Sequence, residues 1–233
     1  MSGMDKVYVA LDNMTKEDIF NFLDKTNNEL KCIKIGLELF NRYGRELILE
    51  IYDKYKLNIF LDLKLHDIPN TVSKSIRSLE NLPISFLTIH ISGGQSMLEA
   101  SVSARDQYLP KCKLLGVSVL TSLDENDMEN IWGITDSKFL FSNLFLLANK
   151  SKIDGVVCSA NELDILNELD LNLISMCPGI RFEDEIKSAN LGDQKRVLSP
   201  TEAFMAKATY LVIGRSITES TSLTERISQL KNM

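Results

Sequence analysis

The chain has 233 residues and a formal net charge of −6 at pH 7, a length that suits one large α/β domain with a sizeable core. The acidic balance, without any run of lysine or arginine, argues against binding to nucleic acids or to an anionic membrane surface. No apolar segment is long enough to span a bilayer and no secretory signal is recognisable, so we expect a soluble, cytoplasmic protein.

Short apolar runs alternate with longer amphipathic stretches along the whole chain. The runs expected to be strands are Val7–Leu11, Cys32–Ile35, Ile59–Leu63, Phe86–Ile91, Leu114–Leu120, Gly155–Cys158, Leu173–Met176 and Tyr210–Ile213. The expected helices include Lys16–Thr26, Leu39–Lys54, Val72–Asn81, Ser96–Gln107, Phe139–Lys150 and Asn161–Leu169. Eight strand-helix units without a linker predict an α/β fold, a single (β/α)8 TIM barrel over residues 1–233, with a doubly wound open sheet as the alternative.

Polar residues fall at or just past the carboxyl ends of different predicted strands. They are Asp12, Lys34, Asp62, Lys64, His90, Thr121, Pro178, Gly179, Gly214 and Arg215. In a barrel these strand ends meet at one mouth, where active sites are built. The pattern therefore favours the barrel over the open sheet and predicts a site at its mouth.

The segment 58–71, NIFLDLKLHDIPNT, carries the strongest chemical signal. Asp62 and Lys64 interrupt an apolar strand at i and i+2, so both side chains are expected on the same face of the sheet. Opposite charges there are costly to desolvate unless they are paired, and paired charges near a pocket often perform proton chemistry. Pro69 precedes a helix-like stretch, which places Asp67 in a loop. A structural ion pair at a strand end is the alternative.

An anion site is predicted towards the C-terminus. In the segment 210–218, YLVIGRSIT, Gly214 and Arg215 follow an apolar strand and begin a helix, an arrangement that suits phosphate. A tight turn with a solvated arginine is the alternative. The long polar segment Cys177–Arg196 is typical of a lid, from which Arg181 and Gln194 would reach the phosphate, although a surface insertion is equally compatible with its composition.

The cysteines and histidines indicate no metal site. The cysteines are far apart, each in or beside an apolar run, which supports neither a zinc cluster nor a disulfide framework: Cys32, Cys112, Cys158 and Cys177. His66 and His90 are not spaced as a metal pair and are interpreted as loop or core residues. Ser159 lacks the Gly-x-Ser-x-Gly setting of a hydrolase nucleophile.

The motif DLKLHDIPNT, with VALD, KIG, VLTS, GVVCSA, PGIR, GDQ and VIGR in the same order, resembles the orotidine 5′-phosphate decarboxylase family from Val7 to Thr218. The resemblance implies cofactor-free and metal-free decarboxylation of orotidine 5′-phosphate to uridine 5′-phosphate in de novo pyrimidine biosynthesis, by a homodimer. It implies that Lys64 is the proton donor, flanked by Asp62 and Lys34, and that Asp67 reaches into the neighbouring subunit's site.

The same resemblance implies a set of substrate-binding residues. They are Asp12, Lys34, Asp62, Leu63, Lys64, Leu65, His66, Asp67, Ile68, Pro69, Asn70, Thr71, Thr121, Arg181, Gln194, Gly214 and Arg215. The chain departs from the bacterial family pattern in two places, since the stretch between Arg181 and Gln194 is a few residues longer and Ser216 stands where proline is frequent.

Two other functions stay open. A ketogulonate-phosphate-type decarboxylase uses the same Asp-x-Lys-x-x-Asp frame around a divalent metal to stabilise an enediolate, and sensitivity to a chelator would distinguish it. A non-catalytic barrel that senses a nucleotide or a sugar phosphate would be expected to lose part of the charged array. The presence of Asp62, Lys64 and Asp67 together disfavours the sensor.

Overall fold

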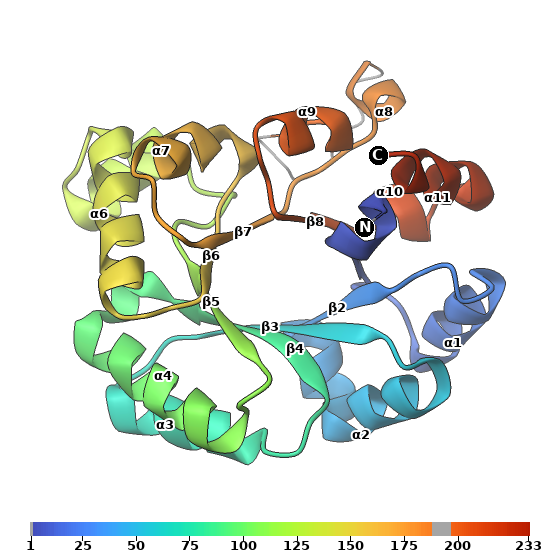
Figure 1. Ribbon diagram of the computed structural model, residues 1–233, viewed down its shortest axis with the longest axis horizontal. Helices are drawn as coiled ribbons and strands as arrows, with labels where there is room; N and C mark the ends of the chain where they lie inside the picture. The colour runs from blue at the N-terminus through green and yellow to red at the C-terminus, as the bar shows by residue number, and fades with distance from the viewer. Residues whose placement is uncertain (1, 188–196) are drawn as a thin grey trace.

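The computed structural model describes residues 2–187 and 197–233. Its eight parallel strands form a closed barrel in sequence order, with β8 pairing with β1 (Figure 1). The strands are β1 (Val7–Ala10), β2 (Cys32–Gly36), β3 (Asn58–Leu65), β4 (Ile84–His90), β5 (Lys113–Val117), β6 (Gly155–Val157), β7 (Ile174–Cys177) and β8 (Tyr210–Ile213). The closed ring confirms the predicted (β/α)8 barrel, and the open-sheet alternative is wrong.

Helices surround the ring of strands (Figure 1). They are α1 (Lys16–Lys25), α2 (Leu37–Tyr55), α3 (Pro69–Ser78), α4 (Gln95–Tyr108), α5 (Glu125–Trp132), α6 (Ser137–Lys150), α7 (Leu163–Glu168), α8 (Glu183–Lys187), α9 (Pro200–Met205), α10 (Arg215–Thr218) and α11 (Leu223–Lys231), with short 3₁₀ turns η1 (Gly3–Lys6), η2 (Ile91–Gly93) and η3 (Ala160–Glu162). Local sequence fixes several starts: Thr15 and Ser199 cap α1 and α9 with reciprocal hydrogen bonds, and Pro69 occupies the first turn of α3. No helix in the described ranges has the length and hydropathy of a membrane span.

One predicted strand is too long. The apolar run Leu114–Leu120 was expected to be a strand throughout, but β5 ends at Val117. Val119 and Leu120 instead line the cavity at the barrel mouth. Their apolar character therefore belongs to the cavity wall and not to the sheet.

A cluster of aromatic side chains fills part of the inside of the barrel. The ring of Tyr8 makes edge-to-face contacts with Phe60, Phe86 and Tyr210 at centroid distances of 5.9, 5.6 and 5.8 Å. Burial raises the pKa of the Tyr8 phenol well above its usual value. Phe60 also lines the cavity at the mouth, so the aromatic cluster adjoins this cavity through one of its rings.

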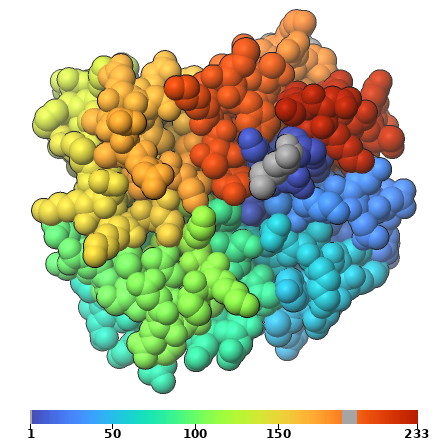
Figure 2. Space-filling view, viewed as in Figure 1, coloured from blue at the N-terminus to red at the C-terminus, as the bar shows by residue number. Residues whose placement is uncertain are grey.

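The two ends of the chain pack together. A Cβ atom on Gly3 of η1 would lie 2.2 Å from the carbonyl oxygen of Leu230 in α11, so glycine alone fits this contact. Figure 2 shows the N-terminal residues, in blue, beside the C-terminal helix, in red. The contact ties the first strand to the last helix of the ring.

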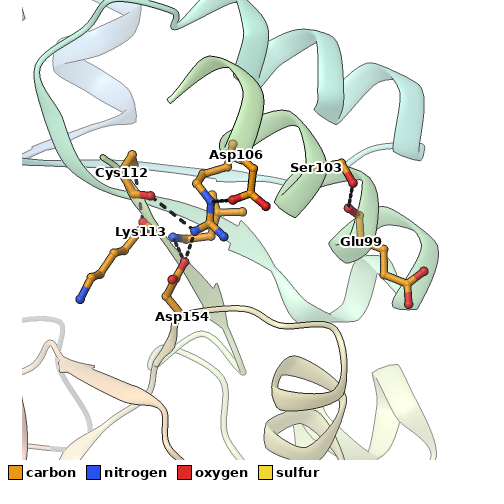
Figure 3. Close-up of polar contacts among 8 residues, drawn as sticks. Glu99, Ser103, Asp106, Cys112, Lys113 and Asp154 are labelled. Carbon is orange, nitrogen blue, oxygen red and sulfur yellow. Dashed lines mark hydrogen bonds and ion pairs between the residues drawn. The ribbon is translucent and has the colours of Figure 1, made fainter. Parts of the chain in front are cut away.

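A buried arginine of α4, Arg105, contacts the region where β5 and β6 begin, and Figure 3 labels its partners Asp106, Cys112 and Asp154. Arg105 is 8 % exposed; its Nε donates to Asp106 at 2.7 Å, and its Nη1 pairs with Asp154 and donates to the Cys112 carbonyl at 3.4 Å. Asp154 also accepts the Leu114 N–H at 2.8 Å. Because Arg105 is buried and its charge is paired, this network stabilises the barrel away from its mouth.

Candidate active site

A cavity of about 420 Å³ opens at the carboxyl ends of the strands. Its wall includes eight residues predicted from the sequence: Asp12, Lys34, Asp62, Lys64, Thr121, Arg181, Gly214 and Arg215. These residues come from β2 and β3 and from loops after β1, β5, β7 and β8, so the fold brings together charges that are up to two hundred residues apart in sequence. The predicted convergence at one barrel mouth is confirmed.

Four of the charged side chains form one line of alternating sign. Lys34 pairs with Asp12 on one side and lies 4.0 Å from the Asp62 carboxylate on the other. Asp62 in turn pairs with Lys64, Oδ2 to Nζ, at 2.7 Å. Lys34 and Asp62 are only 8 % and 9 % exposed. Buried charges of this kind require partners, and here each carboxylate and ammonium has one of opposite sign.

Asp62 and Lys64 meet as predicted, but the strand between them is not regular. Lys64 adopts a left-handed backbone conformation with φ of 48°, and the pairing of β3 with β4 shifts register between Leu61 and Leu65. A non-glycine residue in this region costs of the order of 1–3 kcal/mol and persists where surrounding contacts hold it. The Lys64 ammonium is thus carried on a strained backbone at the strand end.

Thr88 of β4 supports this strained residue, and the sequence reasoning missed it. Its side chain is fully buried; Oγ1 accepts the Lys64 backbone N–H at 2.8 Å and donates to Asp62 Oδ1 at 2.9 Å. One hydroxyl therefore fixes both the backbone of Lys64 and the carboxylate that pairs with its ammonium. A single threonine within an apolar strand carries no pattern that would reveal this role.

The two histidines lie together next to the charged line. Their rings are 5.1 Å apart, with His90 at the end of β4 and His66 exposed in the loop after β3. Burial, and then the nearby His66 and Lys64, lower the pKa of His90 to about 4. His90 is therefore neutral near pH 7 and adds no charge to the site. No group of three potential metal ligands occurs among the described residues.

Two arginines line the cavity from the segments after β7 and β8. Arg181, after β7, is 7 % exposed; its Nη1 donates to Ser216 Oγ at 3.1 Å and its backbone N–H to the Leu198 carbonyl at 3.1 Å. Within the described ranges no carboxylate lies within 4 Å of its guanidinium. Arg215 lines the same cavity from the first turn of α10. A nearly buried guanidinium without an acidic partner suits an anionic ligand.

Gly214 was predicted to allow close backbone approach. A Cβ atom there would lie 3.5 Å from that of Ala10, an ordinary contact, so packing within the protein does not require glycine at this position. The turn that does require one is at Gly179, another cavity residue, whose φ is 77°.

The other predicted residues that the structure describes do not line this cavity. Leu63 and Leu65 belong to β3, and His66, Asp67, Ile68, Pro69, Asn70 and Thr71 lead from it into α3. Asp67 is exposed, and its Oδ1 accepts the Ile68 N–H at 2.7 Å. Ile68 is itself 66 % exposed. Gln194 lies outside the described residues.

Comparison with known proteins confirms the resemblance noted in the sequence. Residues 5–230 match the model of the orotidine 5′-phosphate decarboxylase / HUMPS family. A Coxiella burnetii protein named orotidine 5′-phosphate decarboxylase is 42 % identical over 220 residues, 93 % of this chain and 91 % of the relative. An Aliivibrio fischeri protein of the same name is 37 % identical over 227 residues, 97 % of this chain and 95 % of the relative.

A solved structure agrees with these relatives. The crystal structure of orotidine 5′-phosphate decarboxylase from Lactobacillus acidophilus superposes with a TM-score of 0.81 at 29 % identity, and the match covers 98 % of this chain and 99 % of that one. The match extends over the whole barrel, including every strand that contributes to the cavity. The chain belongs to the orotidine 5′-phosphate decarboxylase / HUMPS family.

Proposed function

We propose that this protein decarboxylates orotidine 5′-phosphate to uridine 5′-phosphate, the step of de novo pyrimidine biosynthesis that removes the C6 carboxylate. The observation that carries the proposal is the line Lys34, Asp62 and Lys64 in the wall of a cavity that Arg181 and Arg215 also line. A nucleotide with a carboxylated base and a phosphate presents two anionic groups to such a cavity.

The phosphate is assigned to the arginine side. Arg181 is nearly buried and its one side-chain hydrogen bond among the described residues is to a neutral hydroxyl, while Arg215 lines the same wall. A guanidinium presents several N–H donors in a fork that matches phosphate oxygens. Contacts so far from the reacting carbon supply binding energy that is used in the chemical step.

The base is assigned to the lysine side. Loss of carbon dioxide leaves negative charge at C6 of the pyrimidine with no adjacent carbonyl to accept it. The Lys64 ammonium, held 2.7 Å from Asp62, would stabilise this charge and then protonate the carbon. Asp62, 9 % exposed, would crowd the substrate carboxylate before reaction, and Lys34 with Asp12 would hold the ribose.

The segment after β3 is assigned to the interface with a second subunit, where it would contribute to that subunit's site. Asp67 and Ile68 are exposed at the edge of the mouth and do not line the cavity of their own chain. We infer a homodimer in which Asp67 and the residues that follow it, up to Thr71 in the first turn of α3, complete the partner's site across a two-fold interface. The proposed location is the cytoplasm, where the four buried free thiols would remain reduced.

The test is the ultraviolet absorbance change on loss of orotidine 5′-phosphate, followed with protein that has been treated with a strong chelator. We expect full activity without added metal, since Asp12 and Asp62, the carboxylates on this side of the cavity, are already paired with lysines. Activity that falls on chelation and returns with magnesium would instead favour the ketogulonate-phosphate type. An absence of turnover with or without metal would refute the proposal.

A further inference from the structure

Ser216 lies behind Arg181 with respect to the cavity. Arg181 and Arg215 line both the main cavity and an adjoining cavity of about 260 Å³, whereas Ser216 lines only the smaller one. Ser216 is 4 % exposed, and its Oγ accepts the hydrogen bond from Arg181 Nη1 at 3.1 Å. The side chain of Ser216 is therefore linked to the main cavity by its hydrogen bond to Arg181.

The contact between Arg181 and Ser216 differs from the contact that Arg226, another arginine lining the smaller cavity, makes with its own partner. Arg226 of α11 makes two hydrogen bonds of 2.7 Å with the carboxylate of Asp184, which compensates its charge. Arg181 is held by a neutral hydroxyl, which restricts the orientation of the guanidinium without compensating its charge. A carboxylate in place of Ser216 would compete with a phosphate for the same donors.

Fixing the orientation matters because arginine has several rotatable bonds. An unrestrained guanidinium loses conformational entropy when it binds an anion, and a side chain held in place beforehand loses less. The bond to Ser216 uses one N–H of the Arg181 guanidinium, and Arg181 itself lines the main cavity.

We propose that Ser216 is a positioning residue that orients Arg181 for the 5′-phosphate of the substrate. The proposal rests on the proposed function and extends it to a residue that does not touch the ligand.

The experiment compares inhibition constants for uridine 5′-phosphate and for uridine, which differ by the phosphate. Ser216→Ala should raise the inhibition constant for uridine 5′-phosphate by about tenfold, since the hydrogen bond that it removes involves a charged group. The inhibition constant for uridine should stay unchanged. Ser216→Thr keeps the hydroxyl and should stay within about threefold of the wild type. Ser151→Ala removes an equally buried hydroxyl that has no hydrogen-bond partner among the described residues, and should change neither constant.

A double-mutant cycle supplies the second measurement. In an Arg181→Ala background, Ser216→Ala should have no further effect on uridine 5′-phosphate, because its action passes through the missing guanidinium. Three results would each overturn the role of Ser216: additive losses of affinity in the double mutant, equal loss of affinity for both ligands, or equal loss of affinity in Ser216→Thr and Ser216→Ala. Wild-type turnover would still support the proposed function in each case. A wild-type protein that neither turns over the substrate nor prefers the phosphorylated ligand would overturn both.

Discussion

Replacing Thr88 with valine tests most directly how Lys64, the proposed proton donor, is supported. Valine has nearly the shape of threonine but no hydroxyl, so Thr88→Val loses the 2.9 Å bond to the Asp62 carboxylate and the 2.8 Å bond from the Lys64 N–H. A hydrogen bond to a charged group contributes about 1.5–3 kcal/mol, and an amide left without a partner costs about 1–3 kcal/mol. Allowing for partial access of water to that amide, we expect the free energy of unfolding to fall by about 3 kcal/mol, which lowers Tm by about 6–12 °C in a domain of this size.

Activity should fall more steeply than stability indicates. Without an acceptor for its backbone N–H, Lys64 moves relative to the reacting carbon, and a displacement near 1 Å costs about 100-fold in rate. Thermal unfolding followed by circular dichroism gives Tm, and the ultraviolet assay gives kcat. Thr88→Ser is the matched control, because it keeps the hydroxyl and should retain most of both. Wild-type Tm and kcat in Thr88→Val, or equal damage in Thr88→Ser, would refute the reasoning.

Three further predictions concern the charged residues and the histidine beside them. Lys64→Ala should abolish turnover yet bind uridine 5′-phosphate within about tenfold of the wild type, because the ammonium acts mainly on charge that develops during reaction, and Lys64→Arg should not restore the rate; more than a few per cent residual activity would contradict this role. Mixing the inactive Lys64→Ala and Asp67→Ala chains should restore roughly a quarter of wild-type activity, since half of randomly exchanged dimers are mixed and each has one intact site, whereas no recovery after proven exchange would place Asp67 in its own subunit's site. The pKa of His90 is lowered from 6.5 to about 4, so between these values the unfolded chain binds more protons and stability falls as the pH falls, by about 1–2 kcal/mol after allowance for its partial exposure; His90→Gln should flatten the loss measured by urea unfolding at pH 7 and pH 5, and an unchanged slope would argue against it.

The barrel could be predicted because each strand is a short apolar run that can be recognised from its own residues alone. Asp62 and Lys64 were visible for the opposite reason, since two charges interrupt such a run. Thr88 and Ser216 could not be found in this way: each is a common small polar residue, and its meaning depends on a partner 24 or 35 residues away in sequence. The left-handed backbone of Lys64 was equally hidden, because lysine gives no local preference for that conformation.

The aromatic cluster inside the barrel limits how molecules reach and leave the site. The rings of Tyr8, Phe60 and Phe86 close the interior below the charged line, with centroids 5.6 to 6.2 Å apart. Rings packed at this distance leave no passage for even a small molecule. These rings thus block passage along the barrel axis, and we expect substrate, carbon dioxide and product to enter and leave through the mouth at the carboxyl ends of the strands.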